Sequence, residues 1–173
     1  MGARPRPPGR VVKPLLDILQ RLQDSSFSVA FVSSPSIWAY PTVLMLHTVG
    51  LAMVVGPNAV LDLRLLGAGS RLPLAALRQV FGVMWIGLAV NASTGLLLFV
   101  SEAADKGTQW IFFVKLLLIA LALTVAVLTK RLVFGGETDP SHPVPTRVKV
   151  LAVASLVLWF GAIIAGRLMA YLH

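Results

Sequence analysis

The sequence predicts an all-α membrane protein, with four transmembrane helices in an up-down bundle preceded by an interfacial amphipathic helix. The 173 residues are 57% hydrophobic and 13% charged, and their mean hydropathy of +0.82 lies far above the soluble globular range. Charged residues are absent from 25–61, 79–101 and 150–166, and only Lys115 interrupts 110–129. Each stretch is close to, or longer than, the roughly 20 apolar residues with which a helix crosses a bilayer.

These stretches must be helices, because in hydrocarbon every backbone polar group needs a partner within its own segment. The strict alternation of a transmembrane barrel strand is missing. We expect a four-helix domain over 36–173, with spans at about 37–57, 74–101, 110–132 and 147–171. The first helix is expected to continue past Pro57 to Leu66, with a kink at Gly56-Pro57. Short connections between the spans favour antiparallel neighbours.

The N-terminal segment differs from the rest in composition. Residues 1–12 combine prolines with arginines and are expected to form a flexible basic tail. From 13 to 34, leucines and isoleucines alternate with polar residues at helical spacing, a pattern too polar to span a bilayer. We interpret 13–34 as an amphipathic helix in the membrane interface. Neither an apolar signal core nor a cleavage site follows the basic residues.

The net charge of +8 reflects basic residues beside the apolar spans, where they anchor helix ends and face anionic headgroups. We therefore expect a lipid bilayer as partner and no nucleic acid. The chain has no cysteine, which excludes disulfides and thiolate metal sites. Lysine and arginine counts near the span ends favour both termini outside the cytoplasm, although the basic N-terminal tail argues the other way.

His47 is the first candidate for a functional residue, because it lies about ten residues into the first span, near the bilayer midplane. At 100° per residue, Asn58 lies about 20° from His47 and Asp62 about 60° from it, so this polar face is expected to point into the bundle. Asn91 lies at similar depth in the second span, with Met84 on the same face. We expect His47 and Asn91 to face each other.

A second predicted feature is an ion-pair cluster near one membrane boundary. Glu102 ends the second span, Lys115 begins the third and Arg167 ends the fourth, and an up-down bundle brings these ends to one side. The cluster could receive an anionic group, such as a haem propionate, a quinone headgroup or a lipid phosphate. The tentative cofactor-binding set is His47, Asn91, Met84, Lys115 and Arg167, with His47 as the tentative metal ligand.

Structural interpretations compete with each of these assignments. A lone intramembrane histidine is explained equally by a hydrogen bond in the bundle core, and Asn91 can simply link helices. Lys115 and Arg167 can extend to the headgroups without any ligand. Haem b suits a four-helix membrane bundle, but His47 is the one histidine within a predicted span. Haem would need a methionine ligand, five-coordination or a partner's histidine.

Several segments resemble a family of small, uncharacterised bacterial inner-membrane proteins, which is distantly similar to copper-resistance D type and cytochrome b561-like membrane domains. They are 40–47 (YPTVLMLH), 61–67 (LDLRLLG), 94–99 (TGLLLF) together with 102–103 (EA), 115–118 (KLLL) and 166–171 (GRLMAY). The resemblance covers about 36–172 and implies a four-helix bundle in the bacterial inner membrane. Members often have a histidine near the position of Lys130, and its absence here weakens a haem, copper or proton-relay role.

Three functions follow as hypotheses. We favour an accessory or structural subunit of a larger membrane complex, of electron-transfer or photosynthetic type, because small-residue faces and the amphipathic helix suit close packing. The alternative is a haem b-linked electron-transfer protein using His47, and a second alternative is an oligomeric permease for a metal ion or small solute. The sequence contains no nucleophile–base pair, phosphate loop or paired catalytic carboxylates. An enzyme is therefore not the favoured interpretation.

Overall fold

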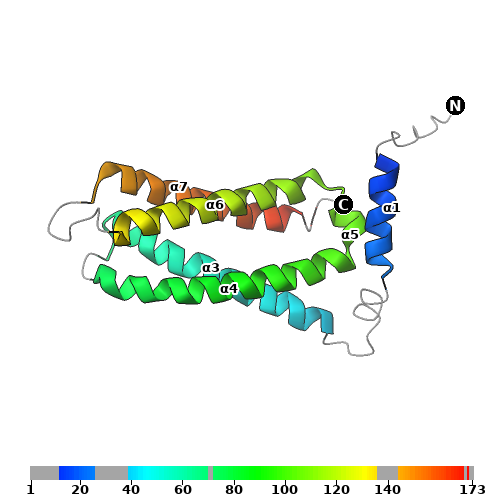
Figure 1. The fold of residues 1–173 in the computed structure, drawn as a ribbon, viewed down its shortest axis with the longest axis horizontal. Helices are drawn as coiled ribbons and strands as arrows, with labels where there is room; N and C mark the ends of the chain where they lie inside the picture. Colours follow the sequence, from blue (N-terminus) through cyan, green and yellow to red (C-terminus); the bar gives the residue numbers. More distant parts are fainter. Residues whose placement is uncertain (1–11, 26–38, 70–71, 136–143, 170, 172–173) are drawn as a thin grey trace.

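The computed structural model describes residues 12–25, 39–69, 72–135, 144–169 and 171, and helices make up most of them (Figure 1). The helices are α1 (Val12–Gln23), α3 (Ala39–Leu65), α4 (Leu74–Ser101), α5 (Ala103–Lys106), α6 (Trp110–Phe134) and α7 (Thr146–Leu168). Over these ranges there is no strand, which confirms the predicted all-α fold.

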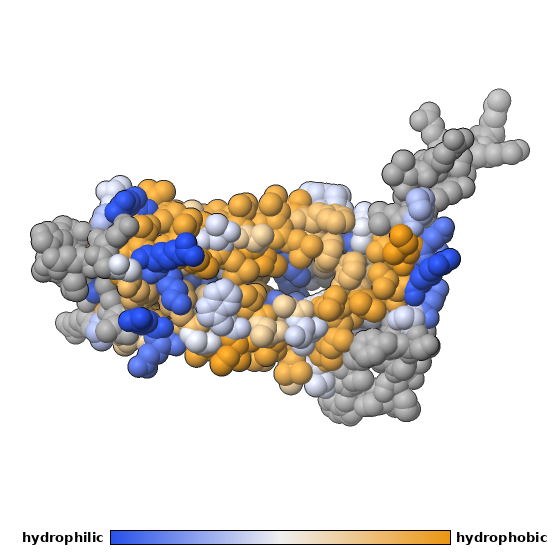
Figure 2. Space-filling model, viewed as in Figure 1, coloured by the Kyte–Doolittle hydropathy of each residue, from blue (hydrophilic) through white to orange (hydrophobic). Residues whose placement is uncertain are grey.

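Four of these helices are long and apolar enough to cross a membrane: Tyr40–Leu65, Ala76–Ser101, Trp110–Phe134 and Thr146–Leu168. Figure 2 shows apolar side chains over most of the long bundle surface, with hydrophilic groups gathered towards its ends. Side chains that would be buried in a soluble bundle are exposed here, including Ile86 at 60% and Val157 at 64%. The chain is a multi-pass membrane protein built as a four-helix bundle.

The bundle consists of two helical hairpins. α3 packs along α4, α6 packs along α7, and α3 also packs against α7 (Figure 1). Between α3 and α4 the chain turns through Gly67 and Gly69, whose φ angles of 107° and 67° are readily adopted by glycine alone. The α3 helix runs through Pro57 without interruption to Leu65, as the sequence predicts.

The crossing of α3 and α4 depends on two glycines. A Cβ on Gly87 would lie 2.5 Å from Cβ of Met53, and one on Gly50 would lie 2.8 Å from the backbone nitrogen of Asn91. Neither gap can hold a methyl group without a shift of one helix. Small residues allow transmembrane backbones to approach this closely, and the resulting van der Waals contact stabilises their association.

The α1 helix lies across one end of the bundle, against the single turn of α5 (Figure 1). Leu19 is buried there against Gly107, and Oε1 of Gln23 accepts a 2.9 Å hydrogen bond from the backbone nitrogen of Ala104. The helix ends at Gln23, earlier than the expected limit of 34, and residues 26–34 of that prediction lie outside the described ranges. The loop expected after the second span contains α5.

Packing is uneven along the bundle. The largest buried apolar cluster lies in the half next to the 66–73 and 135–145 connections, and includes Leu65, Phe81, Val133 and Trp159. Between α4 and α6, aromatic pairs close both ends: Phe81 meets Phe134 at 5.8 Å, and Phe99 meets Phe112 at 4.9 Å between ring centroids. Between these pairs the surface is hollowed, and hydrophilic atoms are visible inside the opening (Figure 2).

Candidate functional site

His47 and Asn91 meet across the α3–α4 interface, so their predicted juxtaposition is confirmed. Nδ1 of His47 lies 3.1 Å from the backbone oxygen of Asn91 and 3.1 Å from Oγ1 of Thr94. In return, Nδ2 of Asn91 donates a 2.8 Å hydrogen bond to the backbone oxygen of His47. We call His47, Asn91 and Thr94 the histidine centre. Gly95 makes room for it, because a Cβ there would lie 3.0 Å from Cε1 of His47.

These contacts assign the tautomer of the neutral imidazole. The backbone oxygen of Asn91 can only accept a hydrogen bond, and the Thr94 hydroxyl has carbonyl acceptors of its own, the nearer being Val90 at 2.6 Å. Nδ2 of Asn91 also approaches Nδ1 at 3.4 Å, which would suit the other tautomer, but the shorter 3.1 Å contact with the Asn91 backbone oxygen requires a proton on Nδ1 and leaves the lone pair on Nε2. No hydrogen bond from the described residues reaches Nε2. Metal-bound histidines show this arrangement, with one ring nitrogen donating to a carbonyl and the other free to ligate.

Lys115 brings a positive charge into the same half of the bundle. From α6 it extends along α7, so that a Cβ on Gly166 would lie 3.5 Å from Cε and 3.7 Å from Nζ of Lys115. It is close enough to His47 to act on it electrostatically. Of the tentative cofactor-binding residues, His47, Asn91 and Lys115 thus occupy one region, at the less densely packed end of the bundle.

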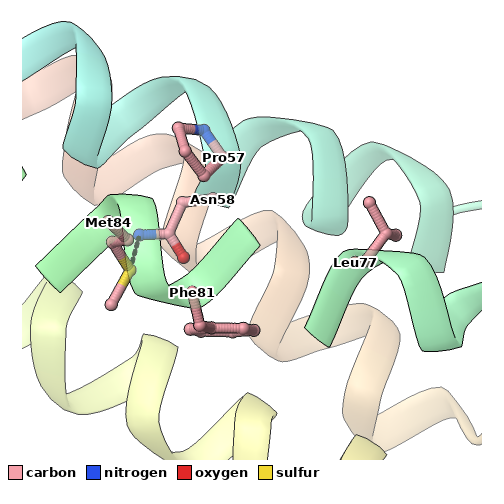
Figure 3. A pocket seen from close by; sticks show the side chains of 5 residues that line it. All are labelled: Pro57, Asn58, Leu77, Phe81 and Met84. Atoms are coloured by element: carbon pink, nitrogen blue, oxygen red, sulfur yellow. Dashed lines mark hydrogen bonds between the residues drawn. The ribbon is translucent and has the colours of Figure 1, made fainter. Parts of the chain in front are cut away.

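Met84 does not belong to this region, which corrects its grouping with His47. Its Sδ accepts a 3.3 Å hydrogen bond from Nδ2 of Asn58 (Figure 3). Asn58 follows His47 by eleven residues, or about 16 Å along α3, which is far more than two ligands of one iron atom can span. The cavity beside Asn58, lined also by Pro57 and Phe81, has no room for a water molecule. A haem site with His47 and Met84 as its two axial ligands is therefore incompatible with this packing.

The predicted cluster of Glu102, Lys115 and Arg167 does not form. Glu102 pairs instead with Lys106, four residues later, with 3.7 Å between Nζ and Oε2, and it accepts a 3.1 Å hydrogen bond from the Tyr40 hydroxyl. Arg167 is exposed, and within the described ranges neither it nor Lys115 forms an ion pair. The reason is that one turn of helix, α5, places Lys106 directly beside Glu102, so the nearer partner satisfies the carboxylate.

A second polar region lies in the densely packed half of the bundle. We call it the carboxylate centre, and all its members are at most 2% exposed. They are Asn58 and Asp62 on α3, Thr129 on α6, and Ser155 and Trp159 on α7. The Ser155 hydroxyl faces the Asp62 carboxylate.

Among the described residues, five buried polar atoms of the carboxylate centre form no hydrogen bond of ordinary geometry: Oδ1 of Asn58, Oδ2 of Asp62, Oγ1 of Thr129, Oγ of Ser155 and Nε1 of Trp159. An unsatisfied buried polar atom costs about 1–3 kcal/mol, and more for a charged group, so five in one region require an explanation. The polar face from His47 to Asp62 was predicted, but Thr129, Ser155 and Trp159 were not. A lone hydroxyl within an apolar run is the signal that points to Thr129 and Ser155.

The two centres lie on the same face of α3 and are separated along the bundle axis. The histidine centre links α3 to α4, whereas the carboxylate centre draws its residues from α3, α6 and α7. Comparison of the chain with protein-family models, curated proteins and solved structures finds no match, so the fold and these two centres are the basis for any functional assignment.

Proposed function

We propose that this chain is an accessory subunit of a larger membrane complex, and that the outward face of α3 receives a transmembrane helix of a partner subunit. The supporting observation is a stripe of exposed residues at helical spacing on α3: Val49, Ala52, Gly56 and Val60. Ala52 and Gly56 are four residues apart, the spacing at which small residues let two transmembrane helices pack closely. A Cβ on Gly56 would meet nothing within 4 Å.

The interior of the bundle is consistent with this role. The hydrogen bonds of the histidine centre join α3 to α4. The glycines of that interface, Gly50 and Gly87, lie in close contact with the opposite helix. A path for solutes has less support, because the cavity beside Asn58 has no room for a water molecule. We assign the protein to the bacterial inner membrane, following the family resemblance, and the complex to the electron-transfer or photosynthetic type on the same basis.

The absence of cysteine allows a direct test by site-specific crosslinking. A photoreactive group on Ala52→Cys, in native membranes, is expected to give a product with a partner protein, and Gly56→Leu is expected to abolish that product by blocking the close approach of helices. The matched control is Ala120→Cys, an exposed alanine in the interior of α6. Equal products at both positions, or a product of twice the chain's mass, would contradict the accessory role.

A haem-linked function is the second candidate, because the tautomer of His47 leaves Nε2 able to ligate iron. His47 would be the axial ligand and Lys115 the partner of a propionate, while haem itself would supply one-electron chemistry. The other two histidines, His142 and His173, lie outside the described ranges. The purified protein would then show a Soret band that is lost in His47→Ala and kept in Met84→Leu. A colourless preparation from haem-supplemented cells would end this proposal.

For topology we propose that both termini lie outside the cytoplasm, with the 66–73 and 135–145 connections inside. Arg64 and Arg78 flank the first of these connections, and Arg131, Arg147 and Lys149 flank the second. A periplasm-dependent reporter enzyme fused after His173 should be active, and one inserted at 139 inactive. The reverse pattern would show that the N-terminal tail sets the orientation.

A further inference from the structure

An open hollow runs along one side of α6, and its lining is apolar except at one end. It encloses about 360 Å³, within the roughly 300–1,000 Å³ of small-molecule sites. The Thr124 hydroxyl in its wall already donates to the backbone oxygen of Ala120 at 2.8 Å. Arg131 is therefore the charged group of a lining that consists of Leu123, Thr124, Val127, Leu128 and Arg131. We call this space the α6 hollow.

The α6 hollow begins on the side of α6 that faces α4. Phe112 and Phe134 each contact a phenylalanine of α4, with 4.9 and 5.8 Å between ring centroids. Leu123 lies midway between them, eleven residues from each, and so within about 20° of both on the helix surface. Between the two aromatic pairs, α4 and α6 do not pack along each other as α3 and α4 do, and the surface is open there (Figure 2). The α6 hollow is thus open sideways to the lipid of the membrane.

The two ends of the α6 hollow lie at different depths in the membrane. Arg131 is in the last turn of α6, close to the end of the spanning segment Trp110–Phe134. Leu123 precedes it by eight residues, or about 12 Å along the helix, towards the membrane interior. The guanidinium of Arg131 can therefore extend to the level of the lipid phosphates, while the apolar lining lies beside the acyl chains.

The charge around the shallow end of the α6 hollow is positive. Arg131 is exposed, and among the described residues no acidic side chain forms an ion pair with it. Lys130 adds a charge towards α4, with its Nζ 5.1 Å from the centroid of the Phe81 ring, and Arg78 is exposed at the same end. Asp62, the one acidic residue described at this end, is 1% exposed. The end therefore attracts anions, and the planar guanidinium of an arginine matches the geometry of phosphate oxygens.

From these observations we propose that the α6 hollow binds one anionic phospholipid of the bilayer, with an acyl chain along Leu123 and Val127 and the phosphate on Arg131. An apolar channel that ends in a cation matches the order of groups in such a lipid. Basic sites at transmembrane helices recognise anionic headgroups in this way. A partner helix fits less well, because it would cover Arg131 without supplying a negative charge. The site is on α6, so it is independent of the docking face on α3.

The test is the thermal stability of the full chain, stripped of lipid in a neutral detergent, with phosphatidylglycerol or phosphatidylcholine of identical acyl chains. A ligand of the folded state raises the Tm, so phosphatidylglycerol is expected to raise it more. Arg131→Gln should weaken the apparent affinity for phosphatidylglycerol about tenfold and remove this difference. Val127→Trp fills the hollow and should reduce the effect of both lipids. Arg78→Gln is the matched control, because it removes the same charge from the same end.

Three results would overturn the proposal. Equal Tm shifts with the two lipids would show that the hollow does not select an anionic headgroup. An equal loss in Arg78→Gln and Arg131→Gln would show a diffuse attraction to a basic surface. Inorganic phosphate that stabilises the chain as well as phosphatidylglycerol would show an anion site without an acyl chain.

The identity of the occupant is tested separately in native membranes. A photoreactive group on Leu128→Cys, at the exposed edge of the α6 hollow, is expected to label phospholipid. A protein product at this position would assign the hollow to a partner helix and contradict the lipid site. Neither result changes the outcome expected for the crosslink at Ala52 on α3.

Discussion

Replacing Gly87 with leucine is expected to separate α3 from α4 and to lower the free energy of unfolding by about 3 kcal/mol, at the upper end of the usual effect of overpacking. The first added carbon alone would lie 2.5 Å from Cβ of Met53, 2.9 Å from its backbone carbon and 3.0 Å from the backbone oxygen of Gly50. Two of these three atoms belong to the backbone, so no rotamer change can relieve the clash. Reversible unfolding in mixed detergent micelles would measure the loss.

The matched control for this prediction is Gly82→Leu on the same helix. Gly82 is exposed, and a Cβ there would meet nothing within 4 Å. Leucine has the higher helix propensity, so this variant should be as stable as the parent or more stable by up to about 1 kcal/mol. Similar losses in both variants would show that the α3–α4 crossing is looser than described.

Trp159→Ala is expected to cost about 3 kcal/mol, because it leaves a large cavity where α7 meets the buried apolar cluster. Trp159 is 2% exposed and packs within that cluster. Large-to-small changes of aromatic residues in soluble proteins cost about 3–5 kcal/mol. We expect the lower part of that range, since a side chain released into lipid remains in apolar surroundings. The indole N–H has no hydrogen-bond partner among the described residues, so the loss would measure the packing of the side chain.

The neighbouring residue provides the control. Phe160 is 64% exposed on the membrane-facing side of α7, and Phe160→Ala should change the free energy of unfolding by less than about 0.5 kcal/mol. The same unfolding measurement in detergent applies to both variants. If Phe160→Ala were the more destabilising of the two, the assignment of the inner and outer faces of α7 would be reversed.

Much of the fold was predictable because membrane insertion depends on local composition. The apolar runs at 74–101 and 110–132 match α4 and α6 to within two residues at each end. The rotation of 100° per residue also placed Asn58 and Asp62 on the inner face of α3, and both are buried there. The pairing of His47 with Asn91 was also predictable. Both residues belong to one helical hairpin, and their positions along the two spans place them at the same depth in the membrane.

The sequence did not determine every pair of side chains that meet between helices. Two residues can share a helix face, as Asn91 and Met84 do, and yet contact different residues of α3, because seven residues, about 10 Å of helix, separate them. The predicted ion-pair cluster failed for a similar reason. Their depth in the membrane places Glu102, Lys115 and Arg167 at one end, but the carboxylate of Glu102 pairs with Lys106, one helical turn away, and with the Tyr40 hydroxyl.

By itself the sequence determined the number of spanning helices, their approximate limits and the inner face of α3, since these depend on residues within one segment. The tertiary structure alone decided the axial offsets between helices; for α3 and α4, the close packing at Gly50 and Gly87 leaves no room for a shift by a methyl group. Those offsets bring Ser155 to Asp62 and separate Met84 from His47. Hydropathy cannot encode them, because sliding one apolar helix along another changes the contacts but not the composition.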